Sequence, residues 1–179
     1  MKISVFTQII LIVLLLSACS SPKQKDNNST DTSGTSAVKV TPTSLSDASD
    51  KIVEFKEVVG KHKVTYIDFW ASWCGPCRGE MPASQQLRDE YKDKDVNFVY
   101  ISLDEDKNDW TSANTDFGLP NGRSFIIPNP SDSQIPLVFS IRSIPRYILI
   151  DSTGTVIDAD APRPSESGRI KEVLDKMLK

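Results

Sequence analysis

Hydrophobic side chains gather in two runs that are typical of buried strands. These runs, at residues 64–70 and 96–102, consist mainly of β-branched and aromatic residues. The segment between them is predicted to form a helix over 75–92, in which Pro82 should cause a kink. A further helix is expected near 107–116. Because strand, helix and strand follow one another, the pattern predicts a right-handed parallel crossover.

Apolar residues also recur at helical spacing close to residue 50. Ser46 and Asp47 are candidate N-terminal caps, and Gly60 is a candidate C-terminal cap. The sequence therefore predicts a helix over about 47–59, whose apolar face is formed by Ile52, Phe55, Val58 and Val59.

The remainder of the chain mixes turn signals with short apolar runs. Residues 118–131 are rich in proline and are predicted to form a surface loop, followed by a short helix near 132–140. Runs at 147–151 and 155–158, joined through a Thr-Gly pair, predict a β-hairpin. Helical spacing over 165–178 predicts an amphipathic closing helix.

The first residues have the pattern of an export signal. Lys2 precedes an apolar run over residues 9–16, which is too short for a comfortable membrane span. The Leu-Ser-Ala-Cys sequence at 16–19 resembles the end of a bacterial lipoprotein signal. That resemblance implies a signal peptide over 1–18 and a lipidated Cys19 as the first mature residue. An unlipidated signal peptide is the alternative.

The next segment differs in composition from the rest of the chain. Residues 19–44 contain almost no large apolar side chains, so they cannot bury enough surface to offset the entropy of ordering and are predicted to be a disordered tether. A flexible coil of about 25 residues reaches roughly 25–30 Å on average. One domain remains at 45–179, which is long enough to bury a core.

The charge balance is mildly acidic and excludes one class of partner. The whole chain has 21 Lys and Arg residues against 24 Asp and Glu residues, and loss of Lys2 with the signal leaves 20 against 24. The sequence has no basic cluster to neutralise phosphates and no glycine-rich phosphate loop. We therefore expect no nucleic-acid partner.

A Cys-Gly-Pro-Cys sequence stands where the first buried strand gives way to a helix. Cys74 and Cys77 are three positions apart, so they share a helix face at a distance that suits a disulfide. Near the helix start, the sulfur of Cys74 lies close to unpaired N–H groups and the positive end of the helix dipole, which favours its thiolate. We therefore predict that Cys74 is the nucleophile and Cys77 the shielded, resolving thiol.

Two other roles of the cysteine pair fit the sequence less well. A zinc site is disfavoured because, beyond this pair, the chain offers only Cys19 and His62 as soft ligands, so no metal is expected. An inert structural disulfide is disfavoured because closing a four-residue loop gains only about 2 kcal/mol in the entropy model.

The residues around the pair resemble a known family. Asp-Phe-Trp-Ala-Ser-Trp-Cys-Gly-Pro-Cys-Arg at 68–78 resembles the active-site segment of thioredoxins, and Gly-Glu-Met-Pro at 79–82 resembles the membrane-anchored, TlpA-like branch. The resemblance covers about 60–178. It implies an α/β thioredoxin fold, in which one domain has a central mixed β-sheet flanked by helices.

A second segment, Ser-Ile-Pro-Arg-Tyr-Ile-Leu-Ile-Asp at 143–151, resembles the cis-proline segment of the family. By that likeness Pro145 is a cis-proline facing the disulfide, although an ordinary trans-proline is the alternative without the upstream motif. Arg146 departs from the family pattern, in which a small neutral residue often follows the proline. The resemblance implies a substrate groove formed by Trp73, Gly75, Pro76, Ile144, Pro145 and Arg146.

Two carboxylates are candidates for proton transfer. Asp68 falls within an apolar strand, and the matching acid of thioredoxins lies beneath the disulfide, where a raised pKa lets it exchange a proton with Cys77. TlpA-like proteins place a functional glutamate at the position of Glu80. The alternatives are that Asp68 faces solvent at the strand end and that Glu80 is a solvated helix residue.

These features together favour a lipid-anchored thiol–disulfide oxidoreductase in the cell envelope, facing the periplasm. Its cofactor is expected to be none other than the redox-active Cys74–Cys77 disulfide. The expected partners are disulfide-bearing exported proteins, a membrane or periplasmic thiol donor of electrons, and the membrane itself through the lipid on Cys19. The alternative is a non-catalytic lipoprotein that keeps the fold and binds exported clients.

Overall fold

The computed structural model describes residues 43–179. The predicted signal peptide, Cys19 and the tether up to residue 42 lie outside the described residues. The described part opens on a strand that begins at Ser44, which the sequence assigned to the tether.

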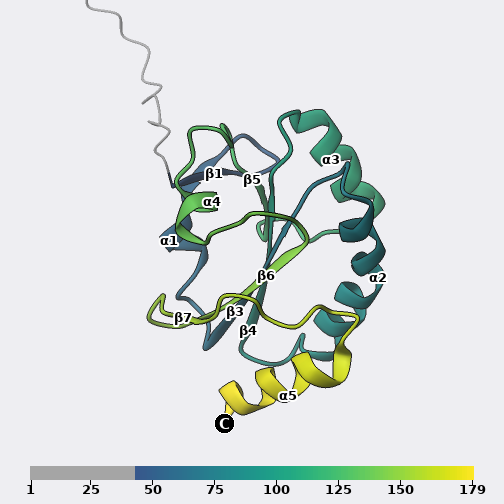
Figure 1. Cartoon of the computed structure of the whole chain (residues 1–179), viewed down its shortest axis with the longest axis vertical. Coiled ribbons are helices and arrows are strands. Elements are labelled where there is room, and N and C mark those ends of the chain that lie inside the picture. Colours follow the sequence, from purple (N-terminus) through teal and green to yellow (C-terminus); the bar gives the residue numbers. More distant parts are fainter. Residues whose placement is uncertain (1–42) are drawn as a thin grey trace, which may run out of the picture. The chain divides into compact units, whose positions relative to one another are not determined.

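A seven-stranded mixed sheet forms the centre of the domain, in the order β2-β1-β5-β4-β3-β6-β7 (Figure 1). β3 and β4 pair in parallel over seven residues, and β5 extends this parallel part beyond β4. β6 pairs antiparallel with the other edge of β3, and the outer strands are antiparallel as well. The strands are β1 (Ser44–Ser46), β2 (Ile52–Glu54), β3 (Val64–Trp70), β4 (Val96–Ser102), β5 (Ser124–Ile126), β6 (Arg146–Asp151) and β7 (Val156–Asp158).

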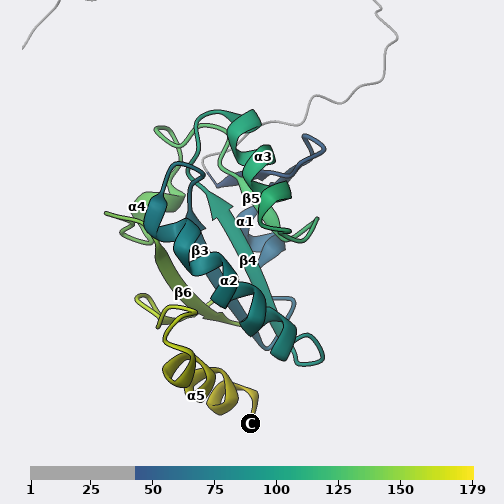
Figure 2. The ribbon, with the colours of Figure 1, turned by 90° about the vertical axis from the view of Figure 1, so that its right-hand side faces the viewer.

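Helices cover both faces of this sheet. α2 and α3 lie on one face, and α1 and α4 lie on the opposite face (Figures 1 and 2). The core is accordingly divided into two apolar clusters, and β3 supplies Tyr66 and Trp70 to the α2 side but Ile67 and Phe69 to the other. The helices are α1 (Phe55–Val58), α2 (Gly75–Glu90), α3 (Lys107–Asp116), α4 (Ile135–Val138) and α5 (Ser167–Leu178).

Most of the elements around the cysteine pair agree with the sequence predictions. The strands at 64–70 and 96–102, their parallel pairing and the helix at 107–116 are confirmed. The hairpin of β6 and β7 and the closing helix are also confirmed, within one or two residues at their ends. Pro82 lies inside α2, which continues past it to Glu90.

The helix predicted over 47–59 is wrong. The chain forms a hairpin of β1 and β2 there, and only Phe55–Val58 is helical. Asp47 nucleates the turn, because its Oδ1 accepts hydrogen bonds from the N–H groups of Ser49 and Lys51 at 2.8 and 3.1 Å. Asp50, with φ of 63°, completes it. Pairing with β1 thus outweighs the helical spacing of the apolar residues.

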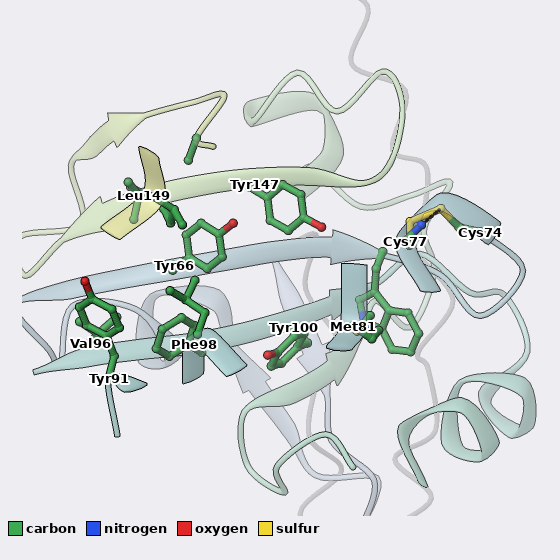
Figure 3. Packing of buried hydrophobic residues seen from close by; sticks show 14 of the residues in the cluster. Tyr66, Cys74, Cys77, Met81, Tyr91, Val96, Phe98, Tyr100, Tyr147 and Leu149 are labelled. Carbon is green, nitrogen blue, oxygen red and sulfur yellow. Dashed lines mark hydrogen bonds between the residues drawn. A yellow bond between two sulfur atoms is a disulfide. The ribbon is translucent and has the colours of Figure 1, made fainter. Parts of the chain in front are cut away.

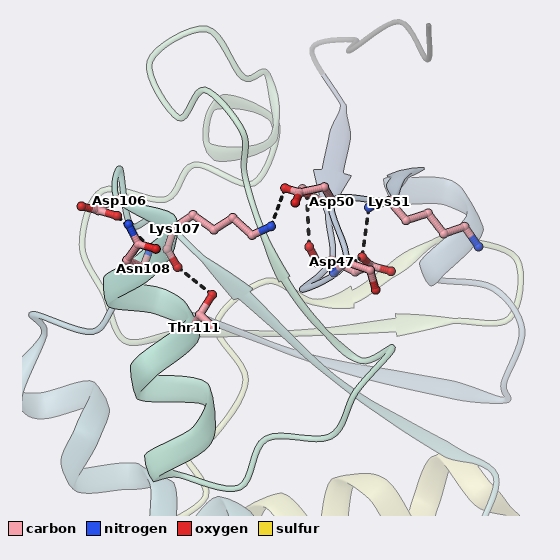
Figure 4. Close-up of polar contacts among 9 residues, drawn as sticks. Asp47, Asp50, Lys51, Asp106, Lys107, Asn108 and Thr111 are labelled. Carbon is pink, nitrogen blue, oxygen red and sulfur yellow. Dashed lines mark hydrogen bonds and ion pairs between the residues drawn. The ribbon is translucent and has the colours of Figure 1, made fainter. Parts of the chain in front are cut away.

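This hairpin turn is tied to the start of α3 (Figure 4). Lys107 forms an ion pair with Asp50. Asp106 caps α3, since its carboxylate accepts a hydrogen bond from the N–H of Asn108 at 2.7 Å. The N-terminal hairpin is therefore attached to the domain through both strand pairing and a side-chain contact.

The surface loop predicted over 118–131 is also partly wrong. Residues 124–126 form β5, which lies between β1 and β4 within the sheet. Phe125, Ile126 and Ile127 are all buried. Three residues are too few to show a periodic pattern, and their pairing partners lie far away in the sequence, so the signal is absent from the local sequence.

Two stacked tyrosines belong to the same apolar cluster as the cysteine pair (Figure 3). The rings of Tyr66 and Tyr147 are 5.5 Å apart and nearly parallel, and both side chains are buried. The Tyr66 hydroxyl donates a hydrogen bond to the carbonyl of Pro162 at 2.8 Å. The Tyr147 hydroxyl has no hydrogen-bond partner among the described residues.

This difference predicts opposite effects for the same substitution. Tyr147→Phe should raise the free energy of unfolding by about 1 kcal/mol, because it removes a buried polar group without a partner. Tyr66→Phe is the matched control and should lower it by about 1 kcal/mol, because the Pro162 carbonyl then loses its donor. Urea titration of both variants measures the two changes, and equal effects would contradict the assignment.

Candidate active site

Cys74 and Cys77 form a disulfide at the start of α2. Cys74 is the N-cap residue of this helix, and its Sγ accepts a hydrogen bond from the N–H of Cys77 at 3.2 Å. Pro76 lies in the first turn of α2, where its missing N–H costs no helical hydrogen bond. In the reduced protein, the same N–H and the helix dipole would stabilise a thiolate on Cys74.

The two sulfur-bearing residues differ in their surroundings. Cys77 is 1% exposed and Cys74 5%, whereas Trp73 is 68% exposed and Gly75 and Pro76 are exposed as well. Small or flat exposed residues therefore surround the more accessible sulfur. This arrangement agrees with the predicted division between an attacking Cys74 and a shielded Cys77.

A cis peptide bond joins Ile144 to Pro145, the isomer that the resemblance implied. Its position follows from the sheet. Arg146 begins β6 and pairs with Phe69, one residue before the end of β3. Pro145 consequently lies at the end of the sheet from which the chain enters the cysteine loop. Ile144 packs against both apolar clusters.

Asp68 is buried on the face of the sheet that carries the cysteines. It lies between Tyr66 and Trp70, and side chains alternate along a strand, so all three point towards the α2 side. Asp68 is 2% exposed, and neither of its carboxylate oxygens has a hydrogen-bond partner among residues 43–179. Burial raises its pKa well above the ordinary value, and the nearby charge of Glu80 raises it further. The solvent-facing alternative for Asp68 is therefore wrong.

Glu80 is also buried, but it has hydrogen-bond donors. Its carboxylate accepts hydrogen bonds from the N–H and the Oγ of Ser165 at 3.0 and 2.8 Å, and the guanidinium of Arg163 lies 3.9 Å away. Glu80 thus joins α2 to the segment that precedes α5. The alternative of a solvated helix glutamate is wrong.

The side chain of Arg146 turns towards the segment after β7. Its Nε donates a hydrogen bond to the carbonyl of Ala159 at 2.8 Å, and its guanidinium pairs with Asp160 at 3.1 Å. Arg146 therefore has local partners of its own, and its backbone fixes the start of β6.

Sequence reasoning missed a third buried carboxylate, Asp104. It follows the end of β4 and accepts hydrogen bonds from Ser72, in the loop before Cys74, and from Ser102. The available signal was a Ser-Leu-Asp sequence at the end of a parallel strand, next to the strand that leads to the cysteines. Ser165, which donates hydrogen bonds to Glu80, was missed because 85 residues separate the two in the sequence.

A cleft of about 210 Å³ opens beside Trp73, between the start of α2 and α3. Arg78 and Phe117 line it, and the Arg78 guanidinium lies 5.7 Å from the centre of the Phe117 ring. Asp109 and Asp116 line it as well, so the surface next to the disulfide combines aromatic, cationic and acidic groups.

Among residues 43–179, no group of three or more His, Cys, Asp and Glu residues has the geometry of a metal site. No helix in this part of the chain is long and apolar enough to cross a membrane.

Residues 60–156 match a family model described as thioredoxin-like. Among curated proteins, the thiol-disulfide oxidoreductase ResA of Bacillus thuringiensis (strain Al Hakam) is 32% identical over 114 residues, or 64% of this chain and 62% of that protein. ResA of Oceanobacillus iheyensis is 27% identical over 155 residues, covering 85% and 78% of the two chains. The match to the first relatives thus spans about 62% of their length.

Solved structures give the same result. A protein from Bacteroides vulgatus described as a thiol-disulfide oxidoreductase superposes with a TM-score of 0.64 at 32% identity, covering 75% of this chain and 91% of that one. A protein from Chlorobium tepidum, described as thiol:disulfide interchange protein DsbE, has a TM-score of 0.61 at 28% identity, covering 76% and 92%. The predicted thioredoxin fold is confirmed.

The raised pKa of Asp68 predicts a specific pH dependence of stability. The unfolded carboxyl loses its proton near pH 3.8, whereas the native one retains it. Below that pH both states bind the proton, and its stabilising contribution is complete. As the pH rises towards the native pKa only the native state keeps the proton, so the free energy of unfolding falls by up to about 1.4 kcal/mol per pH unit. Asp68→Asn should remove this loss and stabilise the protein more at pH 8 than at pH 4.

Thermal unfolding of wild type and Asp68→Asn at both pH values measures this difference. Asp89→Asn is the control, because Asp89 is exposed and lies on α2. An equal gain for Asp68→Asn at pH 4 and pH 8 would show that folding does not raise the pKa of Asp68.

Proposed function

Since the chain belongs to the thioredoxin-like family, we propose that it is a thiol–disulfide oxidoreductase that reduces disulfides of exported proteins through Cys74 and Cys77. The observation that carries this proposal is the disulfide at the start of α2, with the Cys77 N–H directed at the Cys74 sulfur. The Gly-Pro pair between the cysteines, which resembles that of reducing thioredoxins, supports the reducing direction.

The reaction begins with the reduced protein. The Cys74 thiolate attacks one sulfur of a client disulfide, whose S–S bond breaks, and the released client thiolate takes a proton from solvent. Cys77 then loses its proton and attacks the Cys74 sulfur, which releases the second client thiolate and leaves the Cys74–Cys77 disulfide. Two electrons pass to the client. An external dithiol must return them, which is why a membrane or periplasmic thiol donor belongs to the proposal.

Asp68 is the proposed acceptor of the Cys77 proton. It lies on the same face of the sheet as Cys77, and burial raises its pKa above that of an ordinary carboxyl, so that it binds a proton more readily. Glu80 is proposed to act on Asp68 by its charge, because it raises the pKa of Asp68 and is itself fixed by Ser165. Client binding is proposed to involve Trp73, Gly75, Pro76, Ile144, Pro145 and Arg146.

The roles of the two cysteines can be separated by trapping. Cys77→Ala should accumulate a mixed disulfide with a client, because the resolving thiol is missing, whereas Cys74→Ala should accumulate none. Non-reducing electrophoresis and mass spectrometry detect the adduct. Preferential alkylation of Cys77 in the reduced wild-type protein at neutral pH would reverse the assignment.

The second candidate function is a binding protein without turnover. The exposed Trp73 and the cleft beside it favour this candidate, since both offer a contact surface for clients. Reduction of insulin with a chemical thiol donor distinguishes the two functions. A pure binder would not accelerate the reaction, whereas an oxidoreductase would, and Cys74→Ala should abolish the acceleration.

The site of action is proposed to be the cell envelope, where a lipid on Cys19 would anchor the protein on the periplasmic side. The Leu-Ser-Ala-Cys sequence before the polar tether supports this location. Cys19→Ser should give a soluble protein or an uncleaved precursor, detected by membrane fractionation. An unmodified mature N-terminus well beyond Cys19 in the wild type, found by mass spectrometry, would contradict lipid anchoring.

A further inference from the structure

The carboxylate of Asp104 is buried beneath the loop that leads into the cysteine pair. Asp104 is 1% exposed, and its oxygens accept hydrogen bonds from the backbone N–H of Ser72 at 3.0 and 3.1 Å and from the Ser72 Oγ at 2.7 Å. The Oγ of Ser102 donates a further hydrogen bond at 2.6 Å. Ser102 Oγ in turn accepts from the N–H of Asp104 at 2.8 Å. The Ser72 N–H, the Ser72 Oγ and the Ser102 Oγ are thus directed at one carboxylate, which only accepts.

These contacts fix a short turn between β3 and α2. The carbonyl of Trp70, the last residue of β3, accepts a hydrogen bond from Leu103 at 2.9 Å. Two residues later Ser72 is held by Asp104. The N–H of Cys74 then donates to the carbonyl of Ala71 at 3.1 Å. Between the end of β3 and the N-cap of α2, a hydrogen bond therefore holds the backbone at every second residue, at Trp70, Ser72 and Cys74.

The position of Cys74 depends on this turn. Its sulfur reaches the N–H of Cys77 only while Cys74 keeps the extended backbone of an N-cap residue, with φ of −82° and ψ of 98°. Trp73 cannot supply the support, because its side chain is mostly exposed. Ser72, two residues before Cys74, is the residue of this loop whose backbone N–H is held by Asp104, which follows the end of β4.

We propose that Asp104 is a positioning residue for the redox pair: by binding Ser72, it holds Cys74 where its sulfur accepts the Cys77 N–H, and so it sets the thiolate stability of Cys74. This inference rests on the proposed dithiol–disulfide chemistry. Asp104 touches neither the client nor the reacting sulfurs in this role. Its action passes through the loop.

The sign of the effect distinguishes positioning from charge. A buried negative charge near Cys74 would by itself raise the thiol pKa, so a mere loss of charge would lower it. Release of the loop does the opposite, because the Cys74 thiolate then loses a hydrogen-bond donor. The informative variants therefore keep the charge and change the geometry.

Asp104→Glu keeps the carboxylate but moves it by one methylene, and Ser72→Ala removes one donor while leaving Asp104 and the Ser72 N–H in place. Asp151→Glu is the matched control. Asp151 likewise accepts two backbone N–H groups and a hydroxyl, from Thr153 and Thr155, but it lies in the β6–β7 turn at the opposite end of β6 from Pro145.

The pH dependence of alkylation of the reduced proteins, read at Cys74 by mass spectrometry, gives the thiol pKa. For Asp104→Glu the thiolate fraction at pH 7 should fall about threefold to tenfold, as expected for losing a capping hydrogen bond. Ser72→Ala should show a smaller fall of the same sign. The reduction potential against glutathione should fall as well, because the reduced form loses stabilisation. Asp151→Glu should lower the melting temperature without changing either value.

Each other outcome overturns the inference. An unchanged Cys74 pKa in Asp104→Glu, with a lowered melting temperature, makes Asp104 merely structural. If Asp104→Glu does not fold, Ser72→Ala decides alone, and a wild-type pKa or a lower one refutes positioning. A wild-type protein that does not exchange with glutathione would instead refute the proposed function, which keeps the two failures distinct.

Discussion

The complete burial of β3 is the constraint on which the site depends. All seven of its residues are buried, and hydrogen bonds to β4 and β6 occupy both of its edges. A shift by one residue would exchange the two faces, so that Asp68 would point into the cluster of Ile67 and Phe69. The register is therefore fixed, and with it the position of Trp70, from which the chain needs only four residues to reach Cys74.

Three buried carboxylates lie around the cysteine segment, and they differ in the hydrogen-bond donors that they receive. Asp104 and Glu80 receive hydrogen bonds from serine hydroxyls and backbone N–H groups, which replace the water that they lose. Asp68 has no such donor among the described residues, and burial raises its pKa. The first two are suited to holding loops in place. Asp68 is suited to holding a proton, since its neutral form is the one that its surroundings favour.

How far the sequence predicts this molecule depends on how local each interaction is. The strands at 64–70 and 96–102 follow from their own residues, because a central strand selects β-branched and aromatic side chains along its whole length. The β1–β2 hairpin and β5 depend on distant partners, and there helical spacing or proline content misled the prediction. In the same way the cysteines were evident from their spacing, whereas Asp104 acts on Ser72 across 32 residues.

The surface around the disulfide bears on which clients the proposed reaction can use. Thiol–disulfide exchange requires the attacking sulfur to meet a client sulfur directly, yet Cys74 is 5% exposed and Cys77 1%. A client must therefore present its disulfide on a chain thin enough to lie over Gly75 and Pro76, with Trp73 offering apolar contact at its side. Disulfides buried in folded proteins cannot meet this requirement. Extended or unfolded chains can meet it, so the low exposure of the two sulfurs favours such chains as clients of the proposed reaction.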